Sequence, residues 1–122
     1  MDVKGLVWVG TATDRFEDTV TFFRDVIGLA SFHSSPGLSI LRTPTGEWVE
    51  VFGPEHEHFP EFDTGPVVEF LVEDVAGARA ELEARGVTFL HETHSWKEFA
   101  WAHFRAPDGR IYGITSGPYR AG

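Results

Sequence analysis

The alternation of apolar and polar residues predicts the same order of elements in both halves of the chain. Strand-like runs, apolar at every position or at every second one, cover residues 5–10, 29–34, 38–42, 47–52, 67–72, 87–93, 99–105 and 110–116. Amphipathic helical patterns begin near Asp14 and Asp74, each after the first strand of its half, and end at Gly28 and Gly86. Each half is therefore predicted to have the order β-α-β-β-β.

Both predicted helices carry end signals and one apolar face. Asp14 and Asp74 suit the N-cap position, and the glycines suit the left-handed position after the last turn. The expected apolar faces are Phe16, Val20, Phe23 and Ile27 in the first helix and Val75, Ala78 and Leu82 in the second. We expect both helices to pack on strands through these faces.

A short motif, Arg-x-Pro-x-Gly, occurs once in each half and aligns the two halves. It occupies residues 42–46 and 105–109 and leads into the last strand of each half. In this alignment Glu50 falls opposite Gly113, so a carboxylate of the first half has no counterpart in the second. A metal site that needs both carboxylates is therefore not expected.

The stretch between the halves combines prolines with alternating charges, which predicts an exposed connection rather than a strand. We expect a single domain over residues 1–122, with module one at 1–53, the connection at 54–65 and module two at 66–118. His56 and His58 lie in this connection and are interpreted as surface residues.

Composition narrows the classes of function. The chain has no cysteine, so disulfides, thiolate metal ligands and a cysteine nucleophile are excluded. The net charge of −9 argues against nucleic-acid binding, which depends on basic residues that neutralise phosphates. No apolar run approaches the roughly 20 residues needed to span a bilayer. The expectation is a soluble cytoplasmic protein that binds neither nucleic acid nor membrane.

Several strands are apolar on both faces, residues 6–9 and 67–72 most clearly. One face of the sheet is expected to pack on the helices. The chain contains too little helix to cover the other face, so that face is expected to enclose a ligand cavity or to contact a second subunit.

Three segments in order resemble the vicinal oxygen chelate superfamily, which includes glyoxalase I, extradiol dioxygenases and bleomycin-resistance proteins. The segments are residues 22–29, which are aromatic-rich and end in Gly-Leu, residues 72–75 leading to Arg85-Gly86-Val87, and residues 104–109. The resemblance implies an α+β fold in which two β-α-β-β-β modules form a cupped mixed sheet with helices on the outer face. It also implies a homodimer.

The resemblance further implies four metal-ligand positions, which in this chain are Trp8, Glu50, Val67 and Gly113. Only Glu50 could bind a metal, whereas a catalytic divalent ion generally needs about three protein ligands. We therefore predict no metal and no cofactor.

What the cup is predicted to contain is aromatic and acid-base side chains. The candidate catalytic residues are Glu50, Glu69 and His103, and the candidate ligand-binding residues are Trp8, Trp48, Glu50, Phe52, Val67, Glu69, Trp101 and His103. Glu69 interrupts an apolar strand, so it serves a ligand, pairs with a structural arginine or lies exposed at the end of the sheet. Aromatic faces favour planar or cationic partners.

Three other residues are interpreted as structural. His91 and His94 occupy odd and even positions of one predicted strand, so their side chains are expected to diverge and to form no ligand pair. Trp96 is interpreted as a residue of the core or of a subunit interface.

These observations leave three hypotheses. The favoured one is a metal-independent small-molecule binding protein that holds a planar or cationic ligand in an aromatic cup. The alternative is an enzyme of lyase, isomerase or dioxygenase type, with a nonstandard metal site or with metal-free acid-base catalysis by Glu50, Glu69 and His103. The third is a degenerate member that acts through dimerisation or a partner protein.

Overall fold

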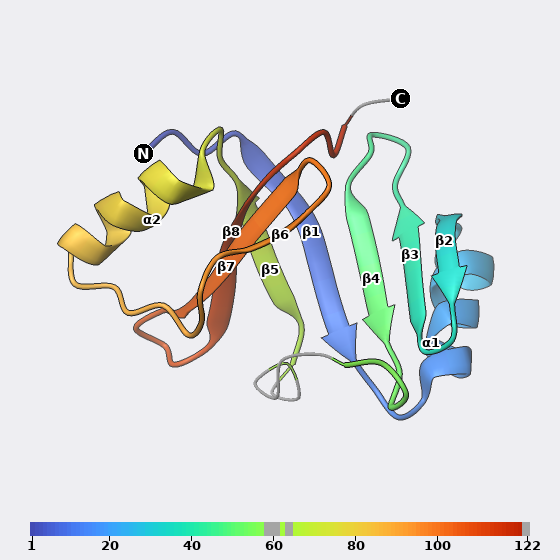
Figure 1. Cartoon of the computed structure of the whole chain (residues 1–122). Helices are drawn as coiled ribbons and strands as arrows, with labels where there is room; N and C mark the ends of the chain where they lie inside the picture. The colour runs from blue at the N-terminus through green and yellow to red at the C-terminus, as the bar shows by residue number, and fades with distance from the viewer. Residues whose placement is uncertain (58–61, 63–64, 121–122) are drawn as a thin grey trace. The chain divides into compact units, whose positions relative to one another are not determined.

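The computed structural model describes residues 1–57, 62 and 65–120 of the chain (Figure 1). The chain divides into two compact units. We call Trp8–Val67 the N-terminal unit and Met1–Val7 with Val68–Ala121 the C-terminal unit. One boundary falls inside the first strand, so Gly5–Val7 of that strand belongs to the C-terminal unit. The other falls after Val67, so the first residue of the strand Val67–Leu71 belongs to the N-terminal unit.

The N-terminal unit contains a mixed set of strands in the order β2-β3-β4-β1. Its elements are β1 (Gly5–Ala12), α1 (Phe16–Thr21), η1 (Phe22–Ile27), β2 (Ala30–Ser35), β3 (Leu38–Arg42) and β4 (Trp48–Phe52). β1 and β4 are parallel, while β3 is antiparallel to both of its neighbours.

The C-terminal unit repeats this pattern in the order β5-β8-β7-β6, with β5 and β8 parallel and the other pairs antiparallel. Its elements are β5 (Val67–Leu71), α2 (Val75–Ala84), β6 (His94–Trp96), β7 (Phe99–Arg105) and β8 (Ile111–Ser116). The predicted α+β class, with two β-α-β-β-β modules and mixed strands, is confirmed.

Helix α2 begins and packs as the sequence predicts. The Asp74 side chain accepts a hydrogen bond from the backbone N–H of Ala76, which satisfies one of the unpaired donors of the first turn. The helix contacts β7 and β8. Its buried Val75 and Ala78 join a core with Val72, Ala102 and Ile114, and Leu82 packs against this core.

The first helical segment differs from its prediction. It is an α-helix only as far as Thr21 and then becomes the π-helix η1, and its N-cap is Arg15, without a side-chain capping bond. The wider turn of a π-helix rotates later side chains away from the 3.6-residue face. Ile27 is therefore 56% exposed instead of buried. Gly28 has the expected left-handed conformation, with φ at 93°.

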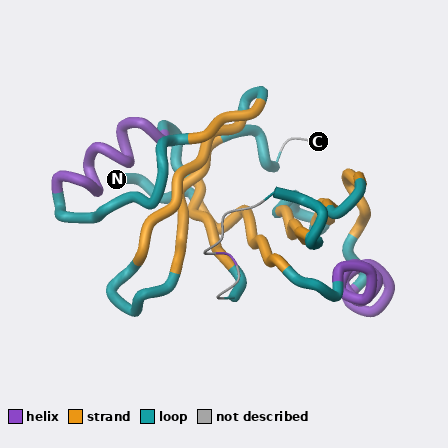
Figure 2. Tube along the Cα trace, turned by 60° about the horizontal axis from the view of Figure 1, so that its bottom comes forward, coloured by secondary structure: helices purple, strands orange, loops and turns teal. Residues whose placement is uncertain are grey.

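The predicted strand at residues 87–93 is wrong. Only an isolated bridge between Phe89 and Phe104 forms there, and Figure 2 draws the segment between α2 and β6 as loop. In place of hydrogen bonds between strands, the segment has hydrogen bonds from a side chain. Arg79 Nη1 donates to the His91 carbonyl at 2.9 Å and to Thr93 Oγ1 at 3.1 Å. A tertiary contact thus overrides the strand propensity of this segment.

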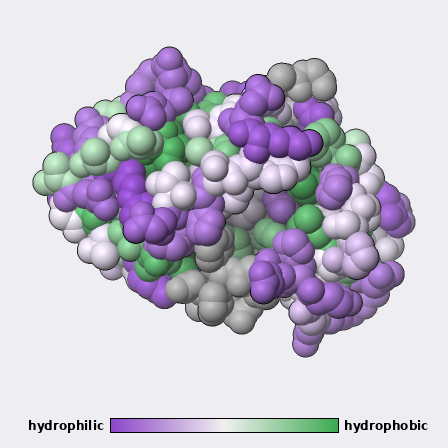
Figure 3. Space-filling view, in the orientation of Figure 1, coloured by the Kyte–Doolittle hydropathy of each residue, from purple (hydrophilic) through white to green (hydrophobic). Residues whose placement is uncertain are grey.

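The surface seen in Figure 3 carries many hydrophilic residues, in keeping with the net charge of −9. Within the described parts of the chain, no helix has the length and apolar character needed to cross a membrane. Trp96 is 53% exposed, so its interpretation as a core residue is wrong.

Candidate functional site

In each module the strand register pairs a glycine with a glutamate. The glycine is on the first strand in the first module and on the last strand in the second module. In the first module Gly10 of β1 pairs with Glu50 of β4. In the second module Glu69 of β5 pairs with Gly113 of β8. Because β1 corresponds to β5 and β4 to β8, the predicted alignment of Glu50 with Gly113 is confirmed by these registers.

In the N-terminal unit the carboxylate is bonded to an indole. The Trp8 N–H donates to Glu50 Oε1 at 2.8 Å. The Trp8 ring lies over Gly10, where an added Cβ would come within 1.9 Å of Trp8 Cη2. The ring centroid of Trp8 is 6.4 Å from that of Phe52 and 6.0 Å from that of Phe62.

The predicted aromatic residues of this unit are thus brought together, and they are largely enclosed. Trp8 and Trp48 are each 7% exposed and Phe52 is 8% exposed. Phe52 also stacks on His56 at 5.5 Å. His58 lies outside the described residues. A ligand-binding role for these rings stays a prediction.

In the C-terminal unit three side chains form a continuous hydrogen-bonded chain, which we call the relay. Glu69 Oε2 lies 2.6 Å from His103 Nε2, and His103 Nδ1 lies 2.7 Å from His91 Nε2. Glu69 and His103 are 3% and 2% exposed. The relay therefore connects a buried carboxyl to a histidine that is only partly buried.

Gly113 leaves the space that the inner half of the relay needs. It pairs with Glu69 on one side and with His103 on the other, so it lies between them in the sheet. A Cβ at this position would lie 2.7 Å from His103 Cδ2 and 3.0 Å from Glu69 Cγ. Gly113 stands where the first module has Glu50, and the absence of a side chain at Gly113 leaves room for the His103 imidazole.

A backbone carbonyl fixes the positions of the protons in the relay. His91 Nδ1 lies 2.7 Å from the Glu92 carbonyl oxygen, which can only accept, so Nδ1 carries a proton. When His91 is neutral, its Nε2 must accept from His103 Nδ1–H. When His103 is also neutral, its Nε2 must accept from a protonated Glu69. One proton can therefore be held by Glu69, by His103 or by His91, and in each case all hydrogen bonds of the relay remain.

The surroundings favour a protonated Glu69 and an uncharged His91. Burial raises the pKa of the Glu69 carboxyl well above its usual value. Burial also lowers the pKa of His91, and the charges of His103, His94 and Arg79 act in the same direction, against the hydrogen bond to Glu92. Glu69 therefore tends to hold its proton while His91 tends to release one.

The second oxygen of Glu69 has no hydrogen-bond partner among the described residues. Among the described residues Glu69 hydrogen bonds only through Oε2, and no fully enclosed side-chain oxygen or nitrogen of these residues lacks a partner. Oε1 is therefore not fully enclosed.

Two further rings lie beyond His91. The ring centroids of His91 and His94 are 4.7 Å apart, and His94 stacks on Trp101 at 6.1 Å with an interplanar angle of 16°. The expectation that His91 and His94 diverge is wrong, because these residues do not share a strand. Sequence reasoning found Glu69, His103 and Trp101 but missed His91, whose only signal was its place just after a helix and before an edge strand.

The donor atoms do not form a metal cluster. Among residues 1–57, 62 and 65–120, no group of three or more histidine, aspartate or glutamate side chains could hold a metal ion. Both nitrogens of His103 are engaged within the relay. Val67, at an implied ligand position, is 1% exposed at the start of β5.

The fold is shared by solved structures of methylmalonyl-CoA epimerase. One, solved in complex with methylmalonyl-CoA and NH4+, has a TM-score of 0.74 and 18% identity, and the match covers 98% of each chain. The epimerase from Mycobacterium tuberculosis has a TM-score of 0.75 and 18% identity, and the match covers 93% of this chain and 88% of that chain.

A glyoxalase/bleomycin resistance protein/dioxygenase superfamily member from Vibrio splendidus 12B01 is also similar. Its TM-score is 0.67 with 19% identity, over 92% of this chain and 97% of that chain. No protein-family model matches the sequence, and no curated protein matches it either. At this level of identity the likeness concerns the fold, and the chain has the vicinal oxygen chelate fold.

Proposed function

We propose that this chain is a metal-independent acid-base enzyme that transfers a proton to and from a carbon atom next to a carbonyl group of a small-molecule substrate. The observation that carries the proposal is the relay from the Glu69 carboxyl, through His103, to His91. A buried carboxyl with a strongly shifted pKa and a specific hydrogen-bond partner is typical of catalytic groups.

The relay allows a balanced proton transfer. Glu69 Oε1 accepts the substrate proton, while the proton on Oε2 moves to His103 Nε2 and the proton on His103 Nδ1 moves to His91 Nε2. The substrate gains one negative charge and His91 one positive charge, so the net charge of the site is unchanged. Return of a proton from Glu69 to another face or atom of the substrate completes an isomerisation.

The class of substrate is inferred from the comparisons. Two similar structures are epimerases, and one of them was solved with methylmalonyl-CoA. Acyl-CoA thioesters carry a carbon acid next to a carbonyl, which matches the chemistry of the relay. We therefore place such thioesters first among the substrates to be tested. A homodimer and a cytoplasmic location remain predictions.

The test is exchange of the α-proton for deuterium in D2O, followed by proton NMR with methylmalonyl-CoA, propionyl-CoA and acetoacetyl-CoA. We expect the wild-type protein to exchange the α-proton of at least one of these thioesters. In Glu69→Gln the exchange rate should be about 10²–10⁴-fold lower. Glu50→Gln is the matched control, because it makes the same change at the carboxylate of the other module. Equal rates for Glu69→Gln and the wild type would refute the assignment.

A second candidate is binding of a planar or cationic ligand without turnover, by the aromatic residues of the N-terminal unit. It is favoured by the partly exposed Glu50, whose carboxylate accepts from the Trp8 indole, and by the pairing of Trp8 on β1 with Trp48 on β4. Titration with acridinium, followed by tryptophan fluorescence, tests this candidate. We expect quenching that Glu50→Gln weakens and Glu69→Gln does not, and quenching that is unaffected by Glu50→Gln contradicts the candidate.

A further inference from the structure

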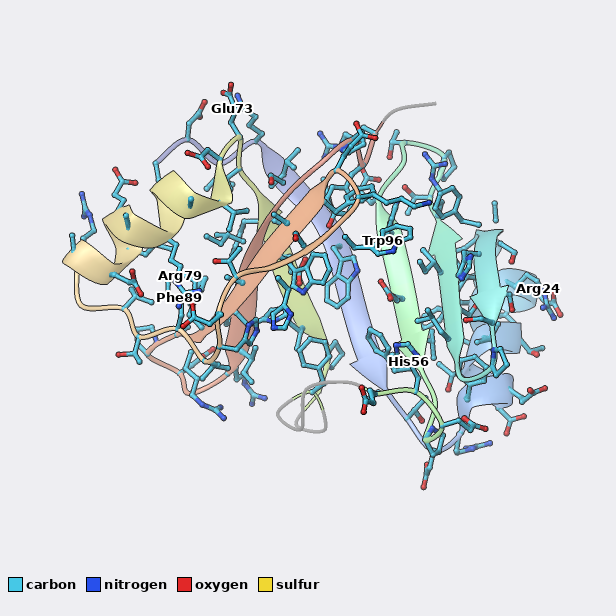
Figure 4. All side chains as sticks on the ribbon, viewed as in Figure 1. Arg24, His56, Glu73, Arg79, Phe89 and Trp96 are labelled. Carbon is cyan, nitrogen blue, oxygen red and sulfur yellow. The ribbon has the colours of Figure 1, made fainter. Side chains whose placement is uncertain are left out.

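Arg79 on α2 makes an unusual set of contacts for a helix residue of this small unit. Its Nη1 donates to the His91 carbonyl at 2.9 Å and to Thr93 Oγ1 at 3.1 Å. Its guanidinium carbon lies over the ring of Phe89, 4.5 Å from the ring centroid. Figure 4 labels both side chains. The Nε of Arg79 is bonded to Glu83 Oε2 at 3.3 Å, and its side chain is only 18% exposed.

These contacts all converge on the loop that carries the outer histidine of the relay. Between α2 and β6 this loop has no strand ladder. Its backbone contacts with β7 are the bridge of Phe89 to Phe104 and a bond from the Leu90 N–H to the His103 carbonyl at 2.9 Å. Arg79 bonds the loop at its His91 carbonyl and at Thr93 Oγ1, while the His91 ring is bonded to His103. Packing alone would not require one guanidinium nitrogen to bond both of these residues.

We propose that Arg79 is a positioning residue, which holds His91 in line with His103 and Glu69 through the backbone of residues 91–93. The inference rests on the proposed function, because it concerns the geometry of the same relay. The planar guanidinium suits this role, since it can lie flat on Phe89 while its N–H groups point along the plane toward the loop.

Arg79 also contributes charge at His91. Together with His103 and His94 it lowers the pKa of His91, although burial has the larger effect. The other titratable groups near this end of the relay are Glu83, which is paired with Arg79, and Glu92, whose carbonyl accepts from His91. Loss of Arg79 should therefore ease protonation of His91 by removing a positive charge and by letting the loop open to water.

The experiment is a pH titration of all histidine rings by two-dimensional proton-nitrogen NMR, which reads both the midpoint and the tautomer of each ring. In Arg79→Met we expect the His91 midpoint to move up and its Nδ1–H tautomer to mix with the other form. Arg79→Lys should restore part of the shift, because an ammonium keeps the charge but not the planar contacts. Arg85→Met is the matched control, since it removes a positive charge from the end of α2, and it should leave His91 unchanged.

A His91 titration in Arg79→Met that matches Arg85→Met would overturn the proposal. If Arg79→Met does not fold, Thr93→Val keeps the proposal testable, because it removes one of the two acceptors of Nη1 at an exposed position. A smaller upward shift of His91 is then expected, and no shift would overturn the proposal.

The proposed function and this inference fail in different ways. Absence of deuterium exchange with every thioester, together with a shifted His91 in Arg79→Met, would refute the enzyme but keep Arg79 as the residue that positions His91. Retained exchange with an unshifted His91 would refute the role of Arg79 and keep the enzyme.

Discussion

The two modules place a glycine, a carboxylate and a ring at neighbouring sheet positions, yet the two sites differ in the ring. In the N-terminal unit Glu50 receives a hydrogen bond from the indole of Trp8. In the C-terminal unit Glu69 shares a hydrogen bond with the imidazole of His103. An indole N–H can only donate, whereas an imidazole donates at one nitrogen and accepts at the other.

The difference has a simple consequence. The indole ends the hydrogen-bond chain at Trp8, while the imidazole carries it on to His91. Ile40 stands opposite Glu50 where His103 stands opposite Gly113, so the first module has no ring at that position of its third strand. Trp8 thus holds the Glu50 carboxylate in place, whereas Glu69 is connected through His103 to His91.

The largest expected effect is on folding, when the space for each ring is filled. A Cβ at Gly10 would lie 1.9 Å from the Trp8 ring, so we expect Gly10→Ala to lower the free energy of unfolding by about 3 kcal/mol. Gly113→Ala, where the nearest contact is 2.7 Å, should cost about 1–2 kcal/mol. Urea denaturation of both variants measures the difference. Equal losses would mean that the two glycines make equivalent space.

The next effect concerns the donor that holds Glu50. Trp8→Phe keeps an aromatic ring but removes the N–H, so we expect a loss of about 2 kcal/mol in the free energy of unfolding. Trp96→Phe is the control, because Trp96 is 53% exposed and should change stability by less than about 0.5 kcal/mol. Similar stabilities for the two variants in urea would contradict a structural role for the Trp8–Glu50 bond.

The smallest effect is on the pH dependence of stability. The raised pKa of Glu69 gives stability that is complete below its unfolded value of 4.5 and is lost as pH rises through the folded pKa. The lowered pKa of His91 acts in the opposite sense, because its contribution is present above 6.5 and is lost as pH falls through the folded pKa.

The measurement is urea denaturation from pH 4 to pH 9 for the wild type and two variants. We expect Glu69→Gln to flatten the decline on the alkaline side, and His91→Asn to flatten the decline on the acid side. Glu50→Gln serves as the control for Glu69→Gln. An unchanged alkaline decline in Glu69→Gln would show that Glu69 does not titrate as its burial requires.

Much of this fold follows from local signals in the sequence. The glycines at residues 28 and 86 and the cap at Asp74 mark helix ends through backbone chemistry, which tertiary contacts rarely change. Glu69 stood out because a carboxylate in an apolar strand must be paired or protonated. Its partner His103 could be placed on the same face from the period of two along the strands.

The rest depended on contacts that no local pattern contains. Residues 87–93 have the composition of a strand, but the bonds from Arg79 hold part of the segment as a loop, and that loop brings His91 to His103. The period read in the first helix also did not indicate the π-helical turns of η1, where bonds from residue i to i+5 shift the apolar face. The structure therefore supplied the third member of the relay.

The bond between His91 Nδ1 and the Glu92 carbonyl has a consequence for how this site can vary. The acceptor belongs to the main chain, so every amino acid at position 92 supplies it. A change of side chain at position 92 therefore does not alter which nitrogen of His91 carries the proton. Natural or designed variants can change the charge beside His91 through residue 92, while the proton of His91 stays on Nδ1.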